Sequence, residues 1–265
     1  MKDMVASKDF ADASCRLLSI KALETYGYYI SHVTFWQYMK QIGINGPRGV
    51  YAKRKQHHAK PDVGEITGPN QLWAWDITFL KTTTLYKKLY LYALLDCWSR
   101  KVIAWVVSDQ LISSEAQFLW DQALIKEKLL NAKADDQPKS LSDRGSQMRS
   151  HSTKDFFKTL GIDQLFSRPR TPNDNPQIES LFSTVKNCPD YPERFNTLEE
   201  AKTYFDTFFN WYNHEHYHTA LKMITPADFH QGKASAILEE RKKLKQKTFR
   251  HRRRYHVGFY MERRV

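Results

Sequence analysis

The sequence lacks the patterns that mark several classes of protein. Its three cysteines, Cys15, Cys97 and Cys188, are odd in number and form no Cys-x-x-Cys pair, which argues against a disulfide framework and a structural zinc site. No apolar run reaches the roughly 18 residues that a membrane-spanning helix needs. The first residues have neither the basic segment nor the apolar block of a signal peptide, so we expect a protein of the reducing cytoplasm.

Acidic residues are scarce at both ends of the chain. Lys and Arg number 41 against 29 Asp and Glu; residues 241–265 carry a formal charge of +10, residues 1–70 carry +4, and residues 71–240 carry −2. Basic ends suit a polyanion such as DNA, because Lys and Arg that neutralise phosphates release condensed counterions. A solvated tail that only aids solubility is the alternative.

A helical region and a linker are predicted before the middle of the chain. From residue 13 to residue 44, apolar residues recur mostly at spacings of three and four, Gly27 can end a first helix, and Ser31 can cap a second. We therefore expect residues 1–45 to be helical and to contain a partial helix-turn-helix DNA-binding region, although such helices can also serve only for packing. Residues 46–70 are rich in Gly, Pro, Lys and Arg, which predicts a basic linker.

The middle of the chain is typical of a mixed sheet with helices. Runs rich in aromatic, Leu, Ile and Val residues predict strands, and apolar spacings of three and four predict helices between them. The expected strands are residues 71–80, 88–95, 101–107, 139–142 and 163–166, and the expected helices are residues 113–130 and 153–160. This order predicts an α/β fold whose sheet is covered on both faces.

Three acidic residues stand where they can form a site. Asp76 falls within the first predicted strand, and Asp143 ends the fourth at a turn that contains glycine. Glu179 falls in the first turn of a helix that Asn175 caps and Pro176 begins. Each acid also has a purely structural explanation. As a set, three carboxylates suit two Mg²⁺ ions roughly 4 Å apart, the arrangement that divalent-cation chemistry on a phosphodiester needs.

Several linked motifs resemble the insertion-sequence transposases of family three. Asp143 and Glu179 are separated by 35 residues, and Lys186 follows Glu179 by seven positions, as the family's basic residue does. The resemblance covers about residues 65–240. It is carried by residues 73–78, 95–100, 142–145, 168–180, 211–213 and 225–227.

The resemblance implies a fold and a chemistry. It implies an RNase H-like mixed five-stranded sheet flanked by helices, and a DDE recombinase whose two Mg²⁺ ions, replaceable by Mn²⁺, are held by Asp76, Asp143 and Glu179. Such an enzyme cleaves one DNA strand at an element end and joins the freed 3′-hydroxyl to another phosphodiester. The expected partners are DNA, further copies of this chain and the product of an upstream reading frame. The resemblance also implies that Lys186, Arg168 and Arg170 bind DNA phosphates near the metal ions. From their charge, Arg144, Arg252, Arg253 and Arg254 are further expected DNA contacts.

The expected division of the chain has five parts. The catalytic core is expected at residues 71–190 and its C-terminal helices at residues 191–240. They follow the helical region 1–45 and the linker 46–70, and residues 241–265 form a basic C-terminal tail.

Two alternatives stay open. Arg144 and Leu141 stand where integrase-like cores often have Asn and His, and the end of the chain departs from the family pattern, so a catalytically inactive DNA-binding relic is one alternative. The other is a zinc hydrolase, because residues 214–218 satisfy the His-Glu-x-x-His pattern. That chemistry needs His214 and His218 one helical turn apart, together with a third ligand.

Overall fold

The chain forms two compact units. The computed structural model describes residue 4 and residues 13–43, 63–84, 86–168 and 175–262, with side chains through residue 253. The sheet unit combines Gln56–His216 and Thr225–Gln231, and the terminal unit combines Met1–Lys55, Tyr217–Ile224 and Gly232–Val265. Most of the expected linker, residues 44–62, lies outside the described residues.

Five strands form one mixed sheet in the order β3-β2-β1-β4-β5. The pairs β1–β2 and β2–β3 are antiparallel, whereas β1–β4 and β4–β5 are parallel. The strands are β1 (Leu72–Leu80), β2 (Leu89–Asp96), β3 (Val102–Ser108), β4 (Lys139–Ser142) and β5 (Gln164–Phe166). The expected α/β fold with a mixed five-stranded sheet is therefore confirmed.

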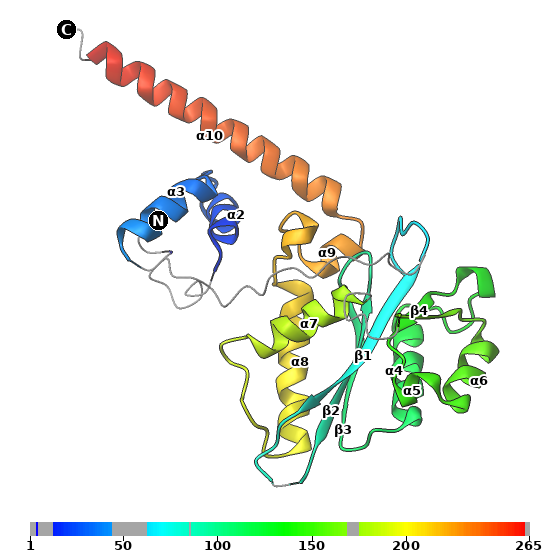
Figure 1. Cartoon of the computed structure of the whole chain (residues 1–265). Coiled ribbons are helices and arrows are strands. Elements are labelled where there is room, and N and C mark those ends of the chain that lie inside the picture. The colour runs from blue at the N-terminus through cyan, green and yellow to red at the C-terminus, as the bar shows by residue number, and fades with distance from the viewer. Residues whose placement is uncertain (1–3, 5–12, 44–62, 85, 169–174, 263–265) are drawn as a thin grey trace. The chain divides into compact units, whose positions relative to one another are not determined.

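Helices cover both faces of this sheet (Figure 1). Residues of α4 to α6 form a core on one face, and residues of α7 and α8 form a core on the other. The helices of the sheet unit are α4 (Ser113–Lys126), α5 (Ser146–Arg149), α6 (His151–Leu160), α7 (Pro176–Lys186), α8 (Leu198–His214) and α9 (Pro226–His230). Both expected helices of the middle region are present, the first ending four residues earlier than predicted.

The two faces of β1 bury different residues because side chains alternate along a strand. Trp75 is fully buried in the core beneath α4 and α6. Ala74 lies in the opposite core with Phe205 and Phe209 of α8, so the aromatic face of that helix packs against the sheet. Asp76 shares the face of Ala74, and α7 contacts β1. The central strand thus delivers a carboxylate to the face that α7 covers.

The terminal unit contains the predicted helix pair, α2 (Cys15–Tyr26) and α3 (His32–Gln41), together with α10 (Ala234–Glu262). Gly27 ends α2 with a positive φ of 63°, a conformation that favours glycine. Ser31 caps α3 by accepting a hydrogen bond from the N–H of Thr34 at 3.2 Å. The predicted turn and cap are confirmed, and a DNA-binding role of these helices stays a prediction.

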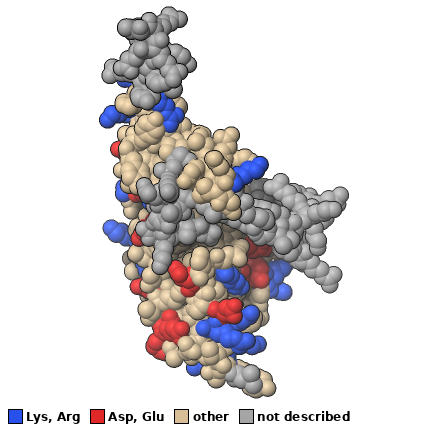
Figure 2. Space-filling view, turned by 90° about the vertical axis from the view of Figure 1, so that its left-hand side faces the viewer, with Lys and Arg blue, Asp and Glu red and all other residues tan. Residues whose placement is uncertain are grey.

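The segment expected to be a basic tail is helical through Glu262. Arg252 donates from Nε to the hydroxyl of Tyr28 at 3.0 Å, and Arg253 is exposed, whereas the side chain of Arg254 lies outside the described residues. On the face shown in Figure 2, acidic and basic side chains are interspersed over the described surface. None of the described helices is long and apolar enough to cross a bilayer.

Candidate active site

Asp76 is partly buried on the central strand β1. Its Oδ1 accepts a hydrogen bond from the N–H of Ile77 at 2.8 Å. Burial is the largest reason that the pKa of Asp76 is raised to about 7, and the negative charges of Asp143 and Glu179 also raise it. The hydrogen bond from Ile77 and the charge of Lys186 lower the same pKa. The three predicted carboxylates therefore lie in one electrostatic neighbourhood.

Asp143 follows β4, the strand that lies parallel to β1. Its Oδ1 accepts a hydrogen bond from the N–H of Gly145 at 2.8 Å. A Cβ atom at position 145 would lie 3.1 Å from that oxygen and 2.9 Å from Sδ of Met148. A Cβ atom at this position would therefore crowd both side chains, so that Asp143 and Met148 would have to shift.

Glu179 lies in the first turn of α7. Ile178 and Phe182 bury the packed face of this helix, so Glu179 projects from the uncovered face. Partial burial of the carboxylate raises the pKa of Glu179. Asn175 is the N-cap residue, as predicted, but its amide makes no capping bond; it is only 5% exposed and has no hydrogen-bond partner among the described residues.

Lys186, at the end of α7, reaches back to the central strand. Its Nζ donates a hydrogen bond to Oγ1 of Thr78 at 2.9 Å. Thr78 lies two positions beyond Asp76 and on the same face of β1. The sequence singled out Lys186 but not Thr78, because the two residues are 108 positions apart and no local pattern connects them.

The predicted arginines of this region lie near the end of β5. Arg144 donates from Nε to the carbonyl of Ser167 at 2.9 Å, and its guanidinium lies over the ring of Phe166. Arg168 follows the same strand end. Arg170 lies outside the described residues, so its predicted contact with DNA has no structural description.

The donor set of the three carboxylates fits hard divalent cations. Carboxylate oxygens are the ligands that Mg²⁺ and Mn²⁺ prefer. Burial first, and then the negative charges of Asp143 and Glu179, raise the pKa of Asp76, and a bound divalent cation would favour its ionised form. Among the described residues, no three His, Cys, Asp or Glu side chains are arranged to hold an ion as they stand. Repulsion between uncompensated carboxylates opposes closer approach of Asp76, Asp143 and Glu179.

The alternative zinc motif does not form the geometry that it needs. His214 is the last residue of α8, and the chain leaves the helix before His218, which pairs with Ile224 in an isolated bridge. The two histidines therefore do not face each other across one helical turn. His216 instead stacks on the ring of Tyr212, with ring centroids 5.2 Å apart. This geometry excludes the zinc hydrolase.

A buried polar network that the sequence did not predict holds α9 to the sheet. His230 Nδ1 lies 2.8 Å from Oγ of Ser99, and its Nε2 lies 3.0 Å from Oε2 of Glu127. Ser99 donates to Oδ1 of Asp96 at 2.6 Å, and Lys101 pairs with Glu127 at 2.6 Å. Ser99 and His230 are 131 positions apart, so no local signal connects them.

Comparison with known proteins finds similarity to integrase cores and to transposases. Residues 66–172 and residues 160–226 match two families that are both described as Integrase core domain. The putative transposase InsK for insertion sequence element IS150 of Escherichia coli is 29% identical over 165 residues, covering 62% of this chain and 56% of the relative. The transposase for insertion sequence element IS904 of Lactococcus lactis is 27% identical over 175 residues, covering 63% and 64%. The match thus spans less than two thirds of either relative.

Further relatives include transposase InsF for insertion sequence IS3A of Escherichia coli, which is 30% identical over 170 residues and matches over 62% of this chain and 54% of its own length. Among solved structures, the catalytic core domain of HTLV-2 integrase in complex with magnesium is 19% identical, with a TM-score of 0.45 over 62% of this chain and 97% of that chain. The two family matches and the three transposase relatives agree. Over the matched part, the chain is similar to the integrase core domain and to insertion-sequence transposases, among them the one of IS3A.

Proposed function

We propose that this chain is a DDE transposase that cleaves DNA strands at insertion-sequence ends and transfers them to a target, with Mg²⁺ or Mn²⁺ as cofactor. The proposal rests mainly on Asp76, whose pKa is raised to about 7 by burial and by the charges of Asp143 and Glu179. An ionised carboxylate in such surroundings destabilises the metal-free fold, and a bound cation would offset that cost, which supports a role for Asp76 as a metal ligand.

Asp76, Asp143 and Glu179 would hold the divalent ions. When bound, such ions activate the attacking water or 3′-hydroxyl and stabilise the leaving oxygen. The three ligands come from different elements. Strand β1 and the end of β4 present Asp76 and Asp143 from the sheet, and α7 presents Glu179 from a separate helix. Gly145 keeps the turn after β4 close to Asp143, which fixes the direction of that carboxylate.

Cationic side chains near these acids would hold the DNA. Lys186 lies close enough to Asp76 to lower its pKa, so its ammonium can bind a phosphate beside the metal ligands. Arg144 points to the end of β5 and, with Arg168 and Arg170, would bind the DNA backbone farther along. Arg252, Arg253 and Arg254 would add contacts from the terminal unit.

The proposed partners follow from the reaction. Two element ends must be brought together, so we propose that copies of this chain assemble on DNA. An upstream-frame protein that supplies further DNA recognition is a second proposed partner. Both would act on DNA in the bacterial cytoplasm.

The direct test is strand cleavage on labelled duplexes that carry the terminal sequences of the element. Wild-type protein, with any upstream-frame product supplied, should nick one strand in Mg²⁺ or Mn²⁺ and then join the freed 3′-hydroxyl to target DNA. Asp76→Asn and Glu179→Gln should abolish nicking and leave DNA binding unchanged. Asp135→Asn, which alters an exposed acid in a surface turn outside the site, is the matched control and should cleave normally.

A catalytically inactive DNA-binding relic is the second candidate. It is favoured by Arg144 beside Asp143, because a cation there competes with a divalent ion, although the bond of Arg144 to Ser167 directs its charge elsewhere. The same assay decides between the candidates. Binding without nicking in either metal ion, with all partners present, would establish the relic.

A further inference from the structure

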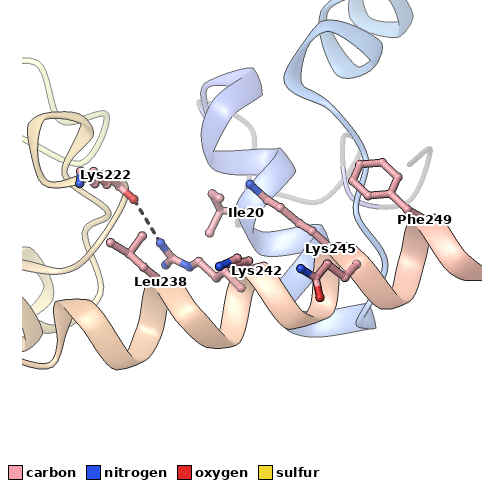
Figure 3. A pocket seen from close by; sticks show the side chains of 8 residues that line it. Ile20, Lys222, Leu238, Lys242, Lys245 and Phe249 are labelled. Carbon is pink, nitrogen blue, oxygen red and sulfur yellow. Dashed lines mark hydrogen bonds between the residues drawn. The ribbon is translucent and has the colours of Figure 1, made fainter.

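A pocket of about 450 Å³ lies in the terminal unit, along the first half of α10 (Figure 3). Its wall is formed by α10, by Ile20 of α2 and by Lys222 of the loop before α9. The dashed line in Figure 3 marks the hydrogen bond from Arg241 to the carbonyl of Lys222, 3.1 Å long. The lining residues are Ile20, Lys222, Leu238, Arg241, Lys242, Lys245, Gln246 and Phe249.

The charged residues that line this pocket are all basic. Its lining includes four basic residues and no Asp or Glu. Arg241 is neutralised by Glu24, which accepts a hydrogen bond from its Nη2 at 2.7 Å, and the guanidinium is 6% exposed. Three ammonium groups remain for a ligand, those of Lys222, Lys242 and Lys245.

Within the described part of the chain, the ammonium groups of Lys222, Lys242 and Lys245 have no strong acidic partner. Lys242 lies 3.8 Å from Glu239, but both side chains are more than half exposed, so the pair contributes little. Lys245 lies 4.9 Å from the ring centroid of Tyr29, a contact that leaves the ammonium able to bind an anion. The pocket therefore attracts negative charge.

The rest of the lining is apolar. Ile20 and Leu238 contribute aliphatic groups, and the ring of Phe249 is 48% exposed. Phe249 packs edge-on against Tyr29, with ring centroids 5.8 Å apart, which holds the ring in place. An exposed aromatic ring beside several amines suits a ligand that combines negative charges with flat apolar groups.

We propose that this pocket binds one strand of DNA, with backbone phosphates on Lys222, Lys242 and Lys245 and a sugar or base against Phe249. DNA is favoured over an acidic protein because residues 241–262 of the same helix carry nine Lys or Arg against one Glu, a charge of +8, and an extended polyanion can follow such a helix. The inference rests on the proposed function, since it supplies a second DNA contact away from the metal ligands.

The test is binding of a fluorescein-labelled oligothymidylate to the full chain in EDTA, measured by anisotropy over a series of salt concentrations. The triple variant Lys222→Ala, Lys242→Ala, Lys245→Ala should weaken binding at least tenfold and reduce the salt slope by about 2, since a single strand contributes about 0.7 per phosphate contact. Phe249→Leu keeps apolar volume but removes the ring, and it should weaken binding about fivefold or more.

The matched control is Lys243→Ala with Lys247→Ala, which removes exposed lysines of the same helix that do not line the pocket. Compared with the corresponding double variant Lys242→Ala with Lys245→Ala, the control should lose less than half as much of the salt slope. Equal losses would overturn the proposal, because they would show a diffuse effect of net charge. Displacement of the oligonucleotide by polyglutamate at the same charge concentration would also overturn it, in favour of an acidic protein partner.

The result is independent of catalysis, because no divalent ion is present. If the pocket variants lose salt slope as expected but the wild-type chain never nicks DNA, the inference stands and the proposed function is refuted. Normal nicking with an unaffected salt slope would refute the inference alone. Circular dichroism of each variant verifies that Arg241 and Glu24 still hold the unit together.

Discussion

Lys186 and Thr78 are joined by a hydrogen bond of 2.9 Å between Nζ and Oγ1, which ties the end of α7 to the central strand beside Asp76. This bond holds the ammonium group near Asp76, whose pKa the charge of Lys186 lowers, while α7 itself presents Glu179. Lys186→Gln should therefore reduce Mg²⁺-dependent nicking about tenfold to a hundredfold, the range expected for loss of one positioned charge at a reacting phosphate. The reduction is measured as the rate of nicking on end-labelled duplexes.

Thr78→Val separates the two roles of Lys186. It removes the bond but keeps the ammonium and the shape of the strand, so we expect a smaller loss of nicking than for Lys186→Gln. If both variants nick DNA at the wild-type rate, Lys186 serves only as a surface charge.

Asp76→Asn should make the metal-free protein more stable while abolishing cleavage. The folded pKa of about 7 exceeds the ordinary value of 3.8, so the ionised carboxylate destabilises the fold increasingly between pH 4 and pH 7. Removing the charge should raise the free energy of unfolding by about 1 to 4 kcal/mol at pH 8 in EDTA, the upper figure being the full shift converted at 1.36 kcal/mol per unit. Urea denaturation at pH 4 and pH 8 measures this.

Divalent ions should stabilise the wild type but not Asp76→Asn. Mg²⁺ should raise the melting temperature of the wild type by mass action and leave that of Asp76→Asn nearly unchanged. Asp135→Asn, the exposed control, should respond to Mg²⁺ as the wild type does. A wild-type melting temperature that ignores both Mg²⁺ and Mn²⁺ contradicts the assignment of the metal ligands.

Gly145→Ala should impair catalysis more than folding. The added Cβ would lie 2.9 Å from Sδ of Met148 and 3.1 Å from Oδ1 of Asp143, so the carboxylate must move. We expect nicking to fall about tenfold or more while the loss of stability stays near 1 to 2 kcal/mol. The control is Gly68→Ala, where the nearest atom lies at an ordinary 3.6 Å, and it should leave nicking intact.

The network around His230 should give the fold a pH-dependent stability. Burial lowers the pKa of His230, but the carboxylates of Asp96, 3.8 Å from Nδ1, and of Glu127, hydrogen-bonded to Nε2, outweigh burial and raise this pKa above 6.5. The stabilisation of the fold by protonated His230 is therefore complete below pH 6.5 and is lost as the pH rises through the pKa of His230 in the folded state. Burial alone would raise the pKa of Glu127, yet bonds from His230, Lys101 and Asn70 lower it to about 2, so its contribution is present above pH 4.5 and is lost as the pH falls.

We therefore expect the network to stabilise the protein most between about pH 4.5 and pH 6.5. Glu127→Gln should cost about 3 kcal/mol in that window, because it leaves buried cations with one partner fewer. Urea denaturation from pH 4 to pH 9 tests this. A variant whose stability tracks the wild type at every pH would show that the network contributes no net charge interaction.

Arg241 and Glu24 should hold the terminal unit together. The ion pair spans 2.7 Å, and the guanidinium also donates to the carbonyls of Lys222 and Met223. Arg241→Met should raise amide hydrogen exchange in α2 and α10 by a factor corresponding to about 1 to 3 kcal/mol, because it removes the bonds to Glu24 and leaves the carbonyls of Lys222 and Met223 without their donor. Lys242→Met, which breaks only the exposed pair with Glu239, should change exchange by less than about 0.5 kcal/mol.

Much of the sheet unit could be predicted from local patterns. Alternation along residues 71–80 placed Asp76 opposite Trp75, because adjacent side chains of a strand must face opposite sides. The turn at Gly27 and the cap at Ser31 were predictable for the same kind of reason, since backbone conformation and capping depend on neighbouring residues. The capping bond expected from Asn175 is absent among the described residues, because its amide is buried away from the helix N–H groups.

Pairings between distant residues were not predictable. Thr78 and Lys186, Ser99 and His230, and Glu24 and Arg241 are separated by more than 100 positions, and no local spacing distinguishes the true partner from many others. Nor does charge composition show that the basic end of the chain is a helix whose Arg241 is neutralised by the N-terminal region. Such contacts depend on which helices and strands pack against one another in the folded chain.

The amino-acid sequence alone determined where most strands and helices lie, because these follow from side-chain periodicity. It also singled out the three acids as candidates, because they fall in motifs that resemble those of a known family. Only the tertiary structure decided that Asp143 and Glu179 lie near enough to Asp76 to raise its pKa, and that Lys186 lowers it. The physical reason is that charges interact through space, and the distances between them are set by the packing of β1, β4 and α7 rather than by their order along the chain.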